Sequence, residues 1–447
     1  MRNRADGLAV NAKPQLAGEP YGSLQEEVQY HRLDASNIDR PPLRIGRERA
    51  DSPVSMLFAL RNRFGSIRLA ALQFLSLGGI GIVWPYVNVY LTDQGFSGTL
   101  IGTLGSAGAF LSLILTPLLN QIADRLLLHR RLFILYMGGF ALANIIFAIA
   151  PHHLLLILAV LLSRLTISPS LTLGMQLTIT FLMSRGKAIL GRLRSFASLG
   201  FTLASLLAGQ LFALGGYPLL FWVAAFIALL TMLTSTIFPD KSREKEKTED
   251  KSRQPRNRGF YVMAASQFFV AMGTYNMYSF IFIHFNQNLG VPSAHIGLWA
   301  ALMGAVEFPF FFLMDAILPK VRIRIAYIIG MLGTSLFAFL LGVVPSLPLL
   351  APLLILRGLV WPCYQLSSFT LVNAISHPRN AATNQAILQV TMPSIALLLT
   401  GSLFGWAYDN LGASAFFSLS ALMTAIGACI VIAGFRLFDA RQVVSSA

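Results

Sequence analysis

The stretch PDKSREKEKTEDKSRQPRNRG, from Pro239 to Gly259, is the longest polar segment between apolar runs in this 447-residue chain. Six apolar runs precede it and six follow it. Each run is long enough for a bilayer core, which needs about 20 apolar residues per helix. The runs lie near 67–91, 98–119, 132–150, 154–182, 195–215, 218–238, 260–286, 296–319, 325–344, 349–373, 383–407 and 413–435. The sequence therefore predicts an all-α membrane protein with twelve transmembrane helices in two six-helix pseudo-repeats.

The predicted organisation has five parts. Residues 1–66 are polar and carry Pro and Arg without a sustained period, which is typical of a disordered cytoplasmic tail. Six-helix bundles are expected at 67–238 and 260–438, with the cytoplasmic linker 239–259 between them and a short tail at 439–447. No signal-peptide pattern precedes the first apolar run, so this run is expected to direct insertion.

Composition narrows the functional classes. The chain is 12% charged and 55% hydrophobic, whereas soluble domains carry about 25% charged residues. Its net charge of +15 comes from residues beside the apolar runs and forms no basic stripe, so nucleic acid is not an expected partner. Cys363 and Cys429 have neither disulfide nor metal-ligand spacing. No phosphate-binding loop or nucleophile elbow occurs, so we expect no cofactor, no metal and no enzymatic activity.

The positive charges alternate from loop to loop. Lys and Arg occur in the polar segments after the second, fourth, sixth, eighth and tenth runs, and none occurs in 92–97, 151–153, 216–217, 287–295, 345–348 or 408–412. By the positive-inside rule, both termini are expected to be cytoplasmic, in a plasma membrane or a bacterial inner membrane.

Two arginines lie inside apolar runs. Arg164 precedes Pro169 in the fourth run, and Arg357 precedes Pro362 at the same spacing in the tenth. A second echo is QGFSGTLIG from Gln94 against NLGVPSAHIG, which opens the eighth run. Such parallel six-helix repeats are typical of transporters that hold a solute between their halves.

Several motifs resemble those of the major facilitator superfamily. NQIADRLLLHRR, from Asn120 to Arg131, resembles the superfamily's loop between its second and third helices, although Asn120 replaces the usual glycine. GRLRSFASLGF from Gly191, WPYVNVYLTDQGFSGTLIG from Trp84 and WAALMGAVEFPFFFLMD from Trp299 resemble the branch of phenylpropionate-type and nucleoside proton symporters, related to the lactose permease group. The resemblance covers about 67–438. It implies a secondary transporter that takes a small organic solute and a proton through the lipid bilayer, and we expect a monomer.

Glu307 and Arg357 are the predicted proton-coupling residues. Glu307 lies in the middle of the eighth run, where desolvation favours its neutral form unless a cation is near. Arg357 needs an anion, and Glu307 is the nearest acidic candidate in its half. The resemblance implies that acidic and basic residues of these two helices belong to the coupling network. The alternative is a purely structural polar contact between helices.

Arg164 has no acidic residue within any apolar run of its own half. It either donates to backbone and hydroxyl groups, reaches Glu307, or meets an anionic group on the solute in the bidentate manner that suits Arg. The other predicted substrate-binding residues are polar or aromatic side chains of the first, seventh and tenth runs: Gln73, Tyr86, Asn88, Tyr275, Asn276, Tyr278 and Gln365.

The predicted gating residues lie at the cytoplasmic ends of helices. They are Asp124, Arg125, Arg130, Arg131 and Asp315. Asp124 is expected to cap or pair with a neighbouring helix end, and Asp315 is its counterpart in the second half.

The favoured function is proton-coupled symport of a small organic solute by alternating access. One alternative is a proton-driven exporter of amphipathic compounds, which a drug-antiporter signature in the fifth run would favour; GRLRSFASLGFTLASLLAGQ is not one. The other is a transporter-like receptor or scaffold that uses the N-terminal tail as its interaction arm.

Overall fold

The structure, a computed structural model, describes residues 53–126, 128–150, 152–183, 190–236, 257–344, 346–377 and 380–438. The chain consists of two units, Met1–Leu57 and Phe58–Ala447, and the packing described below belongs to the second. Every element in the described ranges is helical. The α-helices are α1 (Pro53–Asp93), α2 (Gly98–Leu126), α3 (His129–Ile149), α4 (His153–Met183), α5 (Leu190–Ser235), α6 (Arg258–Ile283), α7 (Ser293–Ile317), α8 (Ile323–Val343), α9 (Leu350–Ile375), α10 (Ala381–Ala386) and α11 (Met392–Ala433).

Short irregular helical segments extend several of these elements. A π-helical turn, η2 (His284–Asn288), follows α6, and a second, η5 (Ile387–Thr391), joins α10 to α11. Three short 3₁₀ turns complete the described part of the chain: η3 (Leu318–Lys320) follows α7, η4 (Leu347–Leu349) precedes α9, and η6 (Phe435–Phe438) follows α11. Helix α1 begins at Pro53, earlier than the expected start of the first run at 67.

Ten helices in the described ranges are long and apolar enough to cross a membrane. Their outward faces carry large apolar side chains. On α8, Ile325, Ile329, Leu332 and Leu336 form a stripe at helical spacing and are 40%, 53%, 43% and 49% exposed. A soluble protein rarely exposes such extended apolar faces, so lipid is the solvent that this surface fits.

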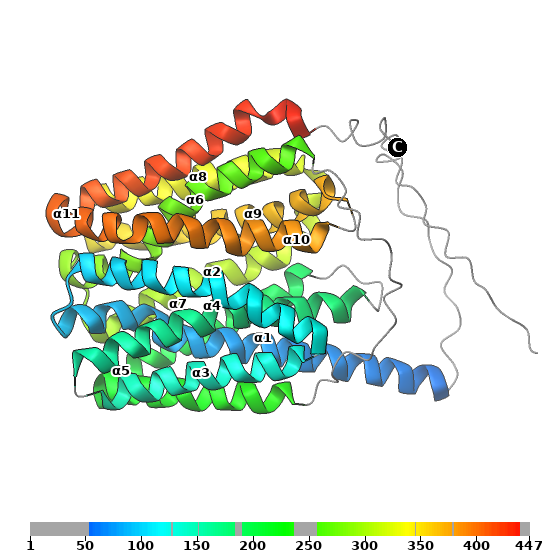
Figure 1. Ribbon diagram of the computed structural model, residues 1–447, viewed down its shortest axis with the longest axis horizontal. Helices are drawn as coiled ribbons and strands as arrows, with labels where there is room; N and C mark the ends of the chain where they lie inside the picture. The colour runs from blue at the N-terminus through cyan, green and yellow to red at the C-terminus, as the bar shows by residue number, and fades with distance from the viewer. Residues whose placement is uncertain are drawn as a thin grey trace, which may run out of the picture. The chain divides into compact units, whose positions relative to one another are not determined.

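Two of the ten helices reverse direction within their length. In α5, Gly215 and Gly216 leave the helical conformation, with φ of 63° at Gly216. In α11, Gly412 has φ of 82°. Glycine adopts this left-handed region without the Cβ clash of other residues. In Figure 1 each of these two helices runs from the right-hand side to the left, turns and returns.

Hydrogen bonds hold the far ends of both helices after they have reversed direction. The Arg130 guanidinium at the start of α3 donates to the Thr236 carbonyl at the end of α5 (3.3 Å). The Arg324 guanidinium at the start of α8 donates to the Phe435 carbonyl just after α11 (3.4 Å). Both returning arms therefore end where other helices begin.

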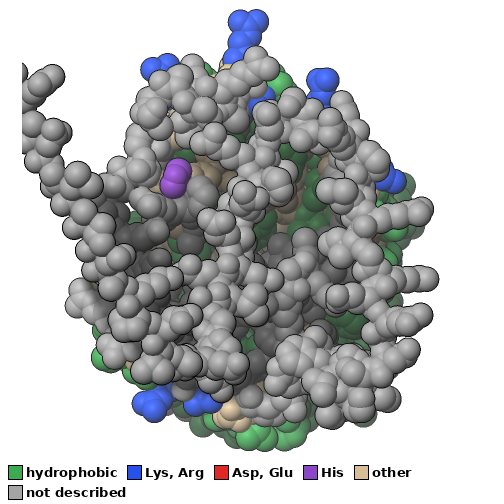
Figure 2. All heavy atoms as spheres, turned by 90° about the vertical axis from the view of Figure 1, so that its right-hand side faces the viewer, with side chains coloured by type: hydrophobic (Ala, Val, Ile, Leu, Met, Phe, Trp, Pro, Cys, Tyr) green, Lys and Arg blue, Asp and Glu red, His purple; other side chains and the backbone are tan. Residues whose placement is uncertain are grey.

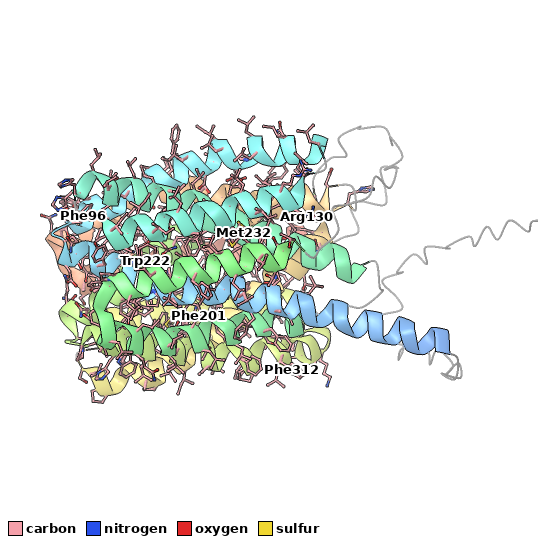
Figure 3. All side chains as sticks on the ribbon, turned by 90° about the horizontal axis from the view of Figure 1, so that it is seen from below. Phe96, Arg130, Phe201, Trp222, Met232 and Phe312 are labelled. Carbon is pink, nitrogen blue, oxygen red and sulfur yellow. The ribbon has the colours of Figure 1, made fainter. Side chains whose placement is uncertain are left out.

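Basic side chains gather at one end of the helices, which we term the basic end. Arg130 and Arg131 begin α3, Arg258 begins α6, and Arg322 precedes α8. Figure 2 looks onto this end and shows Lys and Arg side chains around its rim. Figure 3 shows Arg130 there and Phe96 at the other end, which we term the opposite end. The pattern agrees with the alternation of charge along the sequence.

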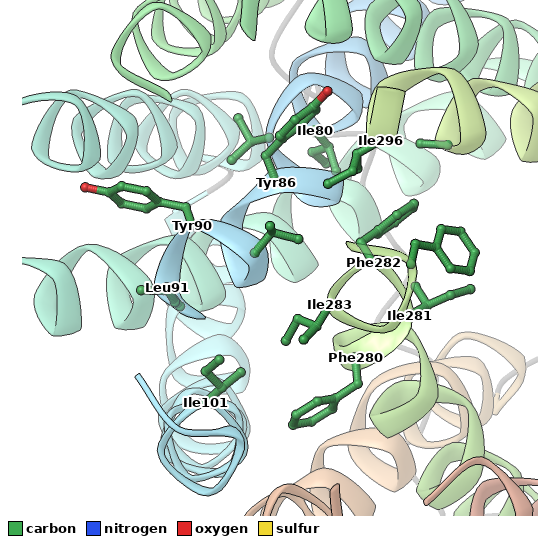
Figure 4. Packing of buried hydrophobic residues seen from close by; sticks show 14 of the residues in the cluster. Ile80, Tyr86, Tyr90, Leu91, Ile101, Phe280, Ile281, Phe282, Ile283 and Ile296 are labelled. Carbon is green, nitrogen blue, oxygen red and sulfur yellow. The ribbon is translucent and has the colours of Figure 1, made fainter. Parts of the chain in front are cut away.

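The two halves share a hydrophobic core at the opposite end. One cluster of buried side chains includes Leu91 and Ile101 from α1 and α2 and Phe280, Ile283 and Ile296 from α6 and α7. Figure 4 shows these side chains from both halves around one region.

Separate clusters lie toward the basic end. Leu72, Phe133 and Met137 belong to a cluster within the first half, whereas Phe260 and Tyr327 belong to a cluster within the second. The described hydrophobic packing therefore joins the halves at the opposite end and stays within each half toward the basic end.

Candidate functional site

An ion pair lies between the middle of α7 and α9. The Arg357 guanidinium contacts the Glu307 carboxylate, and the two residues are 7% and 9% exposed. Gly358 allows this approach, because a Cβ there would overlap Val306 and lie 3.4 Å from the Glu307 backbone nitrogen. The structure thus brings together the two residues that the sequence predicted as a pair.

Aromatic rings complete the environment of Arg357. Its Nε donates to the Tyr278 hydroxyl (3.1 Å). The guanidinium also lies 5.2 Å from the ring centroids of both Tyr278 and Trp361, within the range of cation–π attraction. Since Trp361 lies one helical turn after Arg357, the i, i+4 spacing in the sequence could have identified it.

Glu307 also contacts the other half of the molecule. The Ser198 hydroxyl of α5 donates to Oε2 of Glu307 (3.3 Å). Beside it, a Cβ on Gly304 of α7 would overlap the Thr202 hydroxyl and lie 3.3 Å from the Ser198 carbonyl. The carboxylate therefore lies on the contact between α5 and α7, which we term the α5/α7 seam. Sequence reasoning quoted the motif GRLRSFASLGF, which contains Ser198, but did not name this serine as a site residue, because serine is common in apolar helices.

The α5/α7 seam continues as tight packing toward the opposite end. The Gly297 backbone N–H donates to the Tyr86 hydroxyl (3.0 Å). A Cβ on Gly297 would overlap the Ser205 carbonyl and the Gly209 nitrogen. Glu307 thus lies at the edge of this tightly packed region, on the side nearer the basic end.

An aromatic cluster crosses between the halves beside the ion pair. It consists of Trp84, Phe201, Tyr278, Phe282 and Trp361. The Trp84 ring lies 5.8 Å from Phe201, 6.0 Å from Tyr278 and 5.0 Å from Phe282, and Tyr278 lies 5.6 Å from Trp361. Centroid separations of 4.5–7 Å are typical of favourable ring pairs. Trp84 opens a motif singled out in the sequence, but only the tertiary structure shows that it meets rings of the other half.

Arg164 lies on α4, where Gly108 of α2 makes room for it. A Cβ on Gly108 would overlap the Cβ of Arg164 and lie 3.0 Å from its Cγ. Within the part of the chain that the structure describes, no hydrogen bond or ion pair to Arg164 is found. Of the alternatives that the sequence left open, a contact with Glu307 is absent here, since the described partners of that carboxylate are Arg357 and Ser198.

The predicted substrate-binding residues of α6 divide into two groups. Tyr275 and Tyr278 lie on one face of the helix, and both approach Tyr364 of α9. Tyr275 is 42% exposed, on the face that carries the partner of Arg357. Asn276 is instead fully buried and donates to the Thr400 hydroxyl of α11 (2.9 Å), so it joins two helices of one half.

The remaining predicted lining residues have three different surroundings. Gln73 donates to the Gly174 carbonyl (3.2 Å) and ties α1 to α4. Asn88 donates to the Ser279 carbonyl of the other half (2.6 Å), while its buried amide oxygen has no hydrogen-bond partner among the described groups. The same holds for the buried amide oxygen of Gln365. Tyr86 is buried in the α5/α7 seam.

The predicted gating residues are only partly described. The side chains of Asp124, Arg125 and Asp315 lie outside the described residues. Arg130 ties α3 to the end of α5, and Arg131 is exposed.

This geometry defines a polytopic helical membrane protein with a buried ion pair beside the contact between α5 and α7. A family model described as Major Facilitator Superfamily matches residues 69–392. The chain belongs to this superfamily, as its motifs predicted, and is therefore a membrane transporter by family.

Two curated relatives come from Bacillus subtilis (strain 168). Multidrug resistance protein 1 is 26% identical over 202 residues, which are 44% of this chain and 50% of that protein. Multidrug resistance protein 2 is 27% identical over 190 residues, 42% and 46% of the two chains. The chain matches about half the length of these relatives.

Solved structures share the fold over most of the chain. The nucleoside transporter NupG has a TM-score of 0.62 at 18% identity and covers 84% of this chain and 99% of its own. A POT family transporter in complex with 5-aminolevulinic acid has a TM-score of 0.67 at 12% identity, covering 84% and 97%. The human organic anion transporter MFSD10 has a TM-score of 0.62 at 15% identity, covering 82% and 99%. At these identities the likeness establishes the fold alone.

Proposed function

We propose that this protein is a secondary active transporter that moves a small organic solute by alternating access, coupled to a proton moving in the same direction. In this proposal the glycine breaks of α5 and α11 divide those helices into two spans each, which makes twelve in two six-helix repeats, 67–238 and 260–438. The basic end faces the cytoplasm, as the positive-inside rule requires. The protein acts as a monomer in the bilayer, between a tail at 1–66, a linker at 239–259 and a tail at 439–447.

The proposal rests on the partners of the Glu307 carboxylate, which come from both halves of the molecule. Its charged form is stabilised by Arg357 of its own half and accepts from Ser198 of the other half. Protonation removes the charge that holds Arg357 and weakens the Ser198 hydrogen bond to the carboxylate. A proton on Glu307 therefore changes both a cation in the solute path and a contact between the halves, which is what coupling requires.

The solute site in this proposal lies on the side of Glu307 that faces the basic end. Tyr275 and Trp361 offer ring faces on that side, and Gln365 offers a buried acceptor without a described partner. Sites of this kind combine apolar walls with a few placed polar groups. Arg164 supplies a guanidinium for an anionic group on the solute, and Arg357 becomes a second when Glu307 is protonated.

The structure corresponds to the inward-facing member of the cycle in this proposal. The hydrophobic core that joins the halves lies at the opposite end, whereas the described clusters toward the basic end belong to one half each. Rocking of one bundle against the other would exchange these two arrangements.

Export is the second candidate. Both curated relatives are named multidrug resistance proteins, and the aromatic cluster would suit amphipathic compounds. An exporter would move its solute against the proton, so the direction of movement under an imposed pH gradient separates the two candidates.

The test is transport by purified protein in liposomes. Sugars, nucleosides and aromatic acids are offered with and without an inward-directed proton gradient. Symport predicts gradient-driven accumulation of one class, whereas antiport predicts its expulsion from preloaded vesicles. If no gradient alters the movement of a solute that the protein carries, proton coupling is wrong.

Glu307→Gln is the decisive variant. It keeps the side-chain shape but cannot carry the charge, so we expect gradient-driven accumulation to fall at least about tenfold, while solute exchange between equal concentrations persists. Asp93→Asn is the matched control, since Asp93 is exposed at the opposite end and accepts from the Tyr217 hydroxyl (2.5 Å). Coupled uptake that survives Glu307→Gln would remove this carboxylate from the mechanism.

A further inference from the structure

The second contact between the halves, formed by α2 and α11, is closed by small residues. We term it the α2/α11 seam. A Cβ on Gly102 would overlap the Gly401 carbonyl, and a Cβ on Gly405 would overlap the Gly98 carbonyl. The Ser106 hydroxyl donates to the Leu397 carbonyl across the seam (2.9 Å). Backbones this close leave no room for solvent between the two helices.

Where this seam reaches the opposite end of the molecule, a carboxylate of the second half caps a helix of the first half. Oδ1 of Asp409 accepts from the Gly98 backbone N–H (2.8 Å). Oδ2 accepts from both the Thr99 backbone N–H (2.7 Å) and the Thr99 hydroxyl (2.7 Å). Gly98 and Thr99 begin α2, where backbone N–H groups have no partner within the helix and the helix dipole favours a negative charge.

Among the described residues, no side chain caps the start of α7, the helix that matches α2 in the second half. Gly102 and Gly297 occupy matching places in the two halves, each after an isoleucine, Ile101 and Ile296. The Gly297 backbone N–H donates to the neutral Tyr86 hydroxyl, whereas the backbone N–H groups at the start of α2 donate to a carboxylate. The charge-assisted contact of the α5/α7 seam, from the Ser198 hydroxyl to the Glu307 carboxylate, lies in the middle of the helices, whereas the Asp409 carboxylate binds at the very start of α2.

We infer that Asp409 is a gating residue of the opposite end: its carboxylate latches α11 to the first turn of α2, and the latch breaks each time this end opens. All three hydrogen bonds to the Asp409 carboxylate cross the seam, so separation of α2 from α11 removes them together. Asp409 is exposed and borders a hollow lined by Thr92, Phe280 and Tyr408. Water can therefore solvate the carboxylate once the latch breaks, which keeps the opening reversible.

This inference rests on the proposed alternating access, but its test measures opening without measuring transport. Cys363 and Cys429 are first replaced by Ser, and Gly105→Cys is introduced as the reporter. Gly105 is buried, and a Cβ there makes only an ordinary contact of 3.9 Å with Leu397 of α11. A membrane-impermeant maleimide then reports how often the α2/α11 seam opens from the opposite end.

We expect Asp409→Ala to raise the labelling rate about fivefold, the size of effect expected from loss of a helix cap. Asp409→Asn, which keeps an acceptor but loses the charge, should lie between this variant and the parent. Thr99→Val removes only the hydroxyl donor and should raise the rate about twofold. The control is Asn410→Ala, because Asn410 donates within its own helix to the Trp406 carbonyl.

An unchanged labelling rate in both Asp409 variants would overturn the latch, and so would an equal rise in Asn410→Ala. Thr99→Val and Asp409→Asn keep the inference falsifiable if Asp409→Ala fails to fold, which size-exclusion chromatography would reveal. A faulty assignment of solute or coupling ion leaves these rates unaffected. Conversely, if Asp409 does not act as a latch, the results of the liposome transport assay still test the proposed function.

Discussion

At the scale of single residues, the proposed proton coupling depends on one buried charge pair, Glu307 and Arg357. Two ions lose much of their hydration when they are buried, and their mutual attraction offsets this only with good geometry and further hydrogen bonds. Arg357 has those further contacts in Tyr278 and Trp361, and Glu307 has one in Ser198. An Arg guanidinium keeps its charge in proteins, so Glu307 is the member of the pair that takes up the proton in the proposed cycle.

Removal of Arg357 alone should be costly. Arg357→Leu leaves a buried carboxylate without its cation, and loss of one partner of a buried pair costs about 3–5 kcal/mol. The double variant Glu307→Gln, Arg357→Leu leaves no buried charge and should recover most of the loss. Thermal unfolding in detergent at neutral pH measures both effects as shifts in apparent Tm.

The same pair of variants has a pH signature. The deficit of Arg357→Leu should shrink as the pH falls, because a protonated Glu307 has no charge to leave unpaired, whereas the double variant should show no such recovery. If the double variant is as unstable as the single one, packing of the Arg357 side chain matters more than its charge.

At the scale of helices, two glycine-lined seams decide which end is closed. The α5/α7 and α2/α11 seams both pair glycine with backbone carbonyls of the facing helix. Such close approach favours van der Waals packing, which drives helix association where lipid removes the hydrophobic effect. Each seam is also tied by hydrogen bonds, so the closed arrangement depends on contacts that a single added side chain would prevent.

Gly297→Val should open the α5/α7 seam. Its side chain would overlap the Ser205 carbonyl and the Gly209 nitrogen, both of which are backbone and cannot rotate away. We expect a longer distance between spin labels at Leu214 and Leu298, two exposed positions on α5 and α7, measured by double electron–electron resonance. Gly105→Ala is the control, because a methyl group fits there. Identical distance distributions for Gly297→Val and the parent would show that the neighbouring backbone shifts to fit the valine while the seam stays closed.

At the scale of the whole molecule, the two ends differ in charge and in packing. Basic residues surround one end, and the shared hydrophobic core lies at the other. In the proposed transport cycle, charge decides how the chain is inserted, whereas packing decides which side of the membrane the solute site can reach. The first is set once during synthesis, and the second must change in every transport cycle.

Orientation in the membrane can be tested directly. In a background with Cys363 and Cys429 replaced by Ser, Gln94→Cys places a thiol at the opposite end and Arg131→Cys places one at the basic end; both positions are exposed. An impermeant maleimide added to intact cells should label only Gln94→Cys. In inside-out vesicles the pattern should reverse, and labelling of Arg131→Cys in intact cells would invert the proposed topology.

Much of this protein was readable from the sequence because a bilayer imposes simple rules. Apolar runs of membrane length predicted an all-helical membrane protein; twelve helices were expected, and the described residues form ten of membrane length, two of them broken at glycines. The Lys and Arg loops predicted which helix ends lie together, and the cost of a buried charge singled out Glu307 and Arg357. The motifs led to the superfamily that the family model confirms. Helix ends were less predictable, as the start of α1 at Pro53 shows.

Contacts between the halves were decided by the tertiary structure alone. Ser198 beside Glu307, Trp84 among rings of the other half, and Asp409 at the start of α2 join residues far apart in sequence. Local periodicity and composition record whether a side chain is buried in protein or faces lipid, but they do not record which distant helix it meets. For that reason the positions of the apolar helices and of the basic end follow from the sequence. The partners of the ion pair, the two seams and the Asp409 contact depend on how the two halves pack.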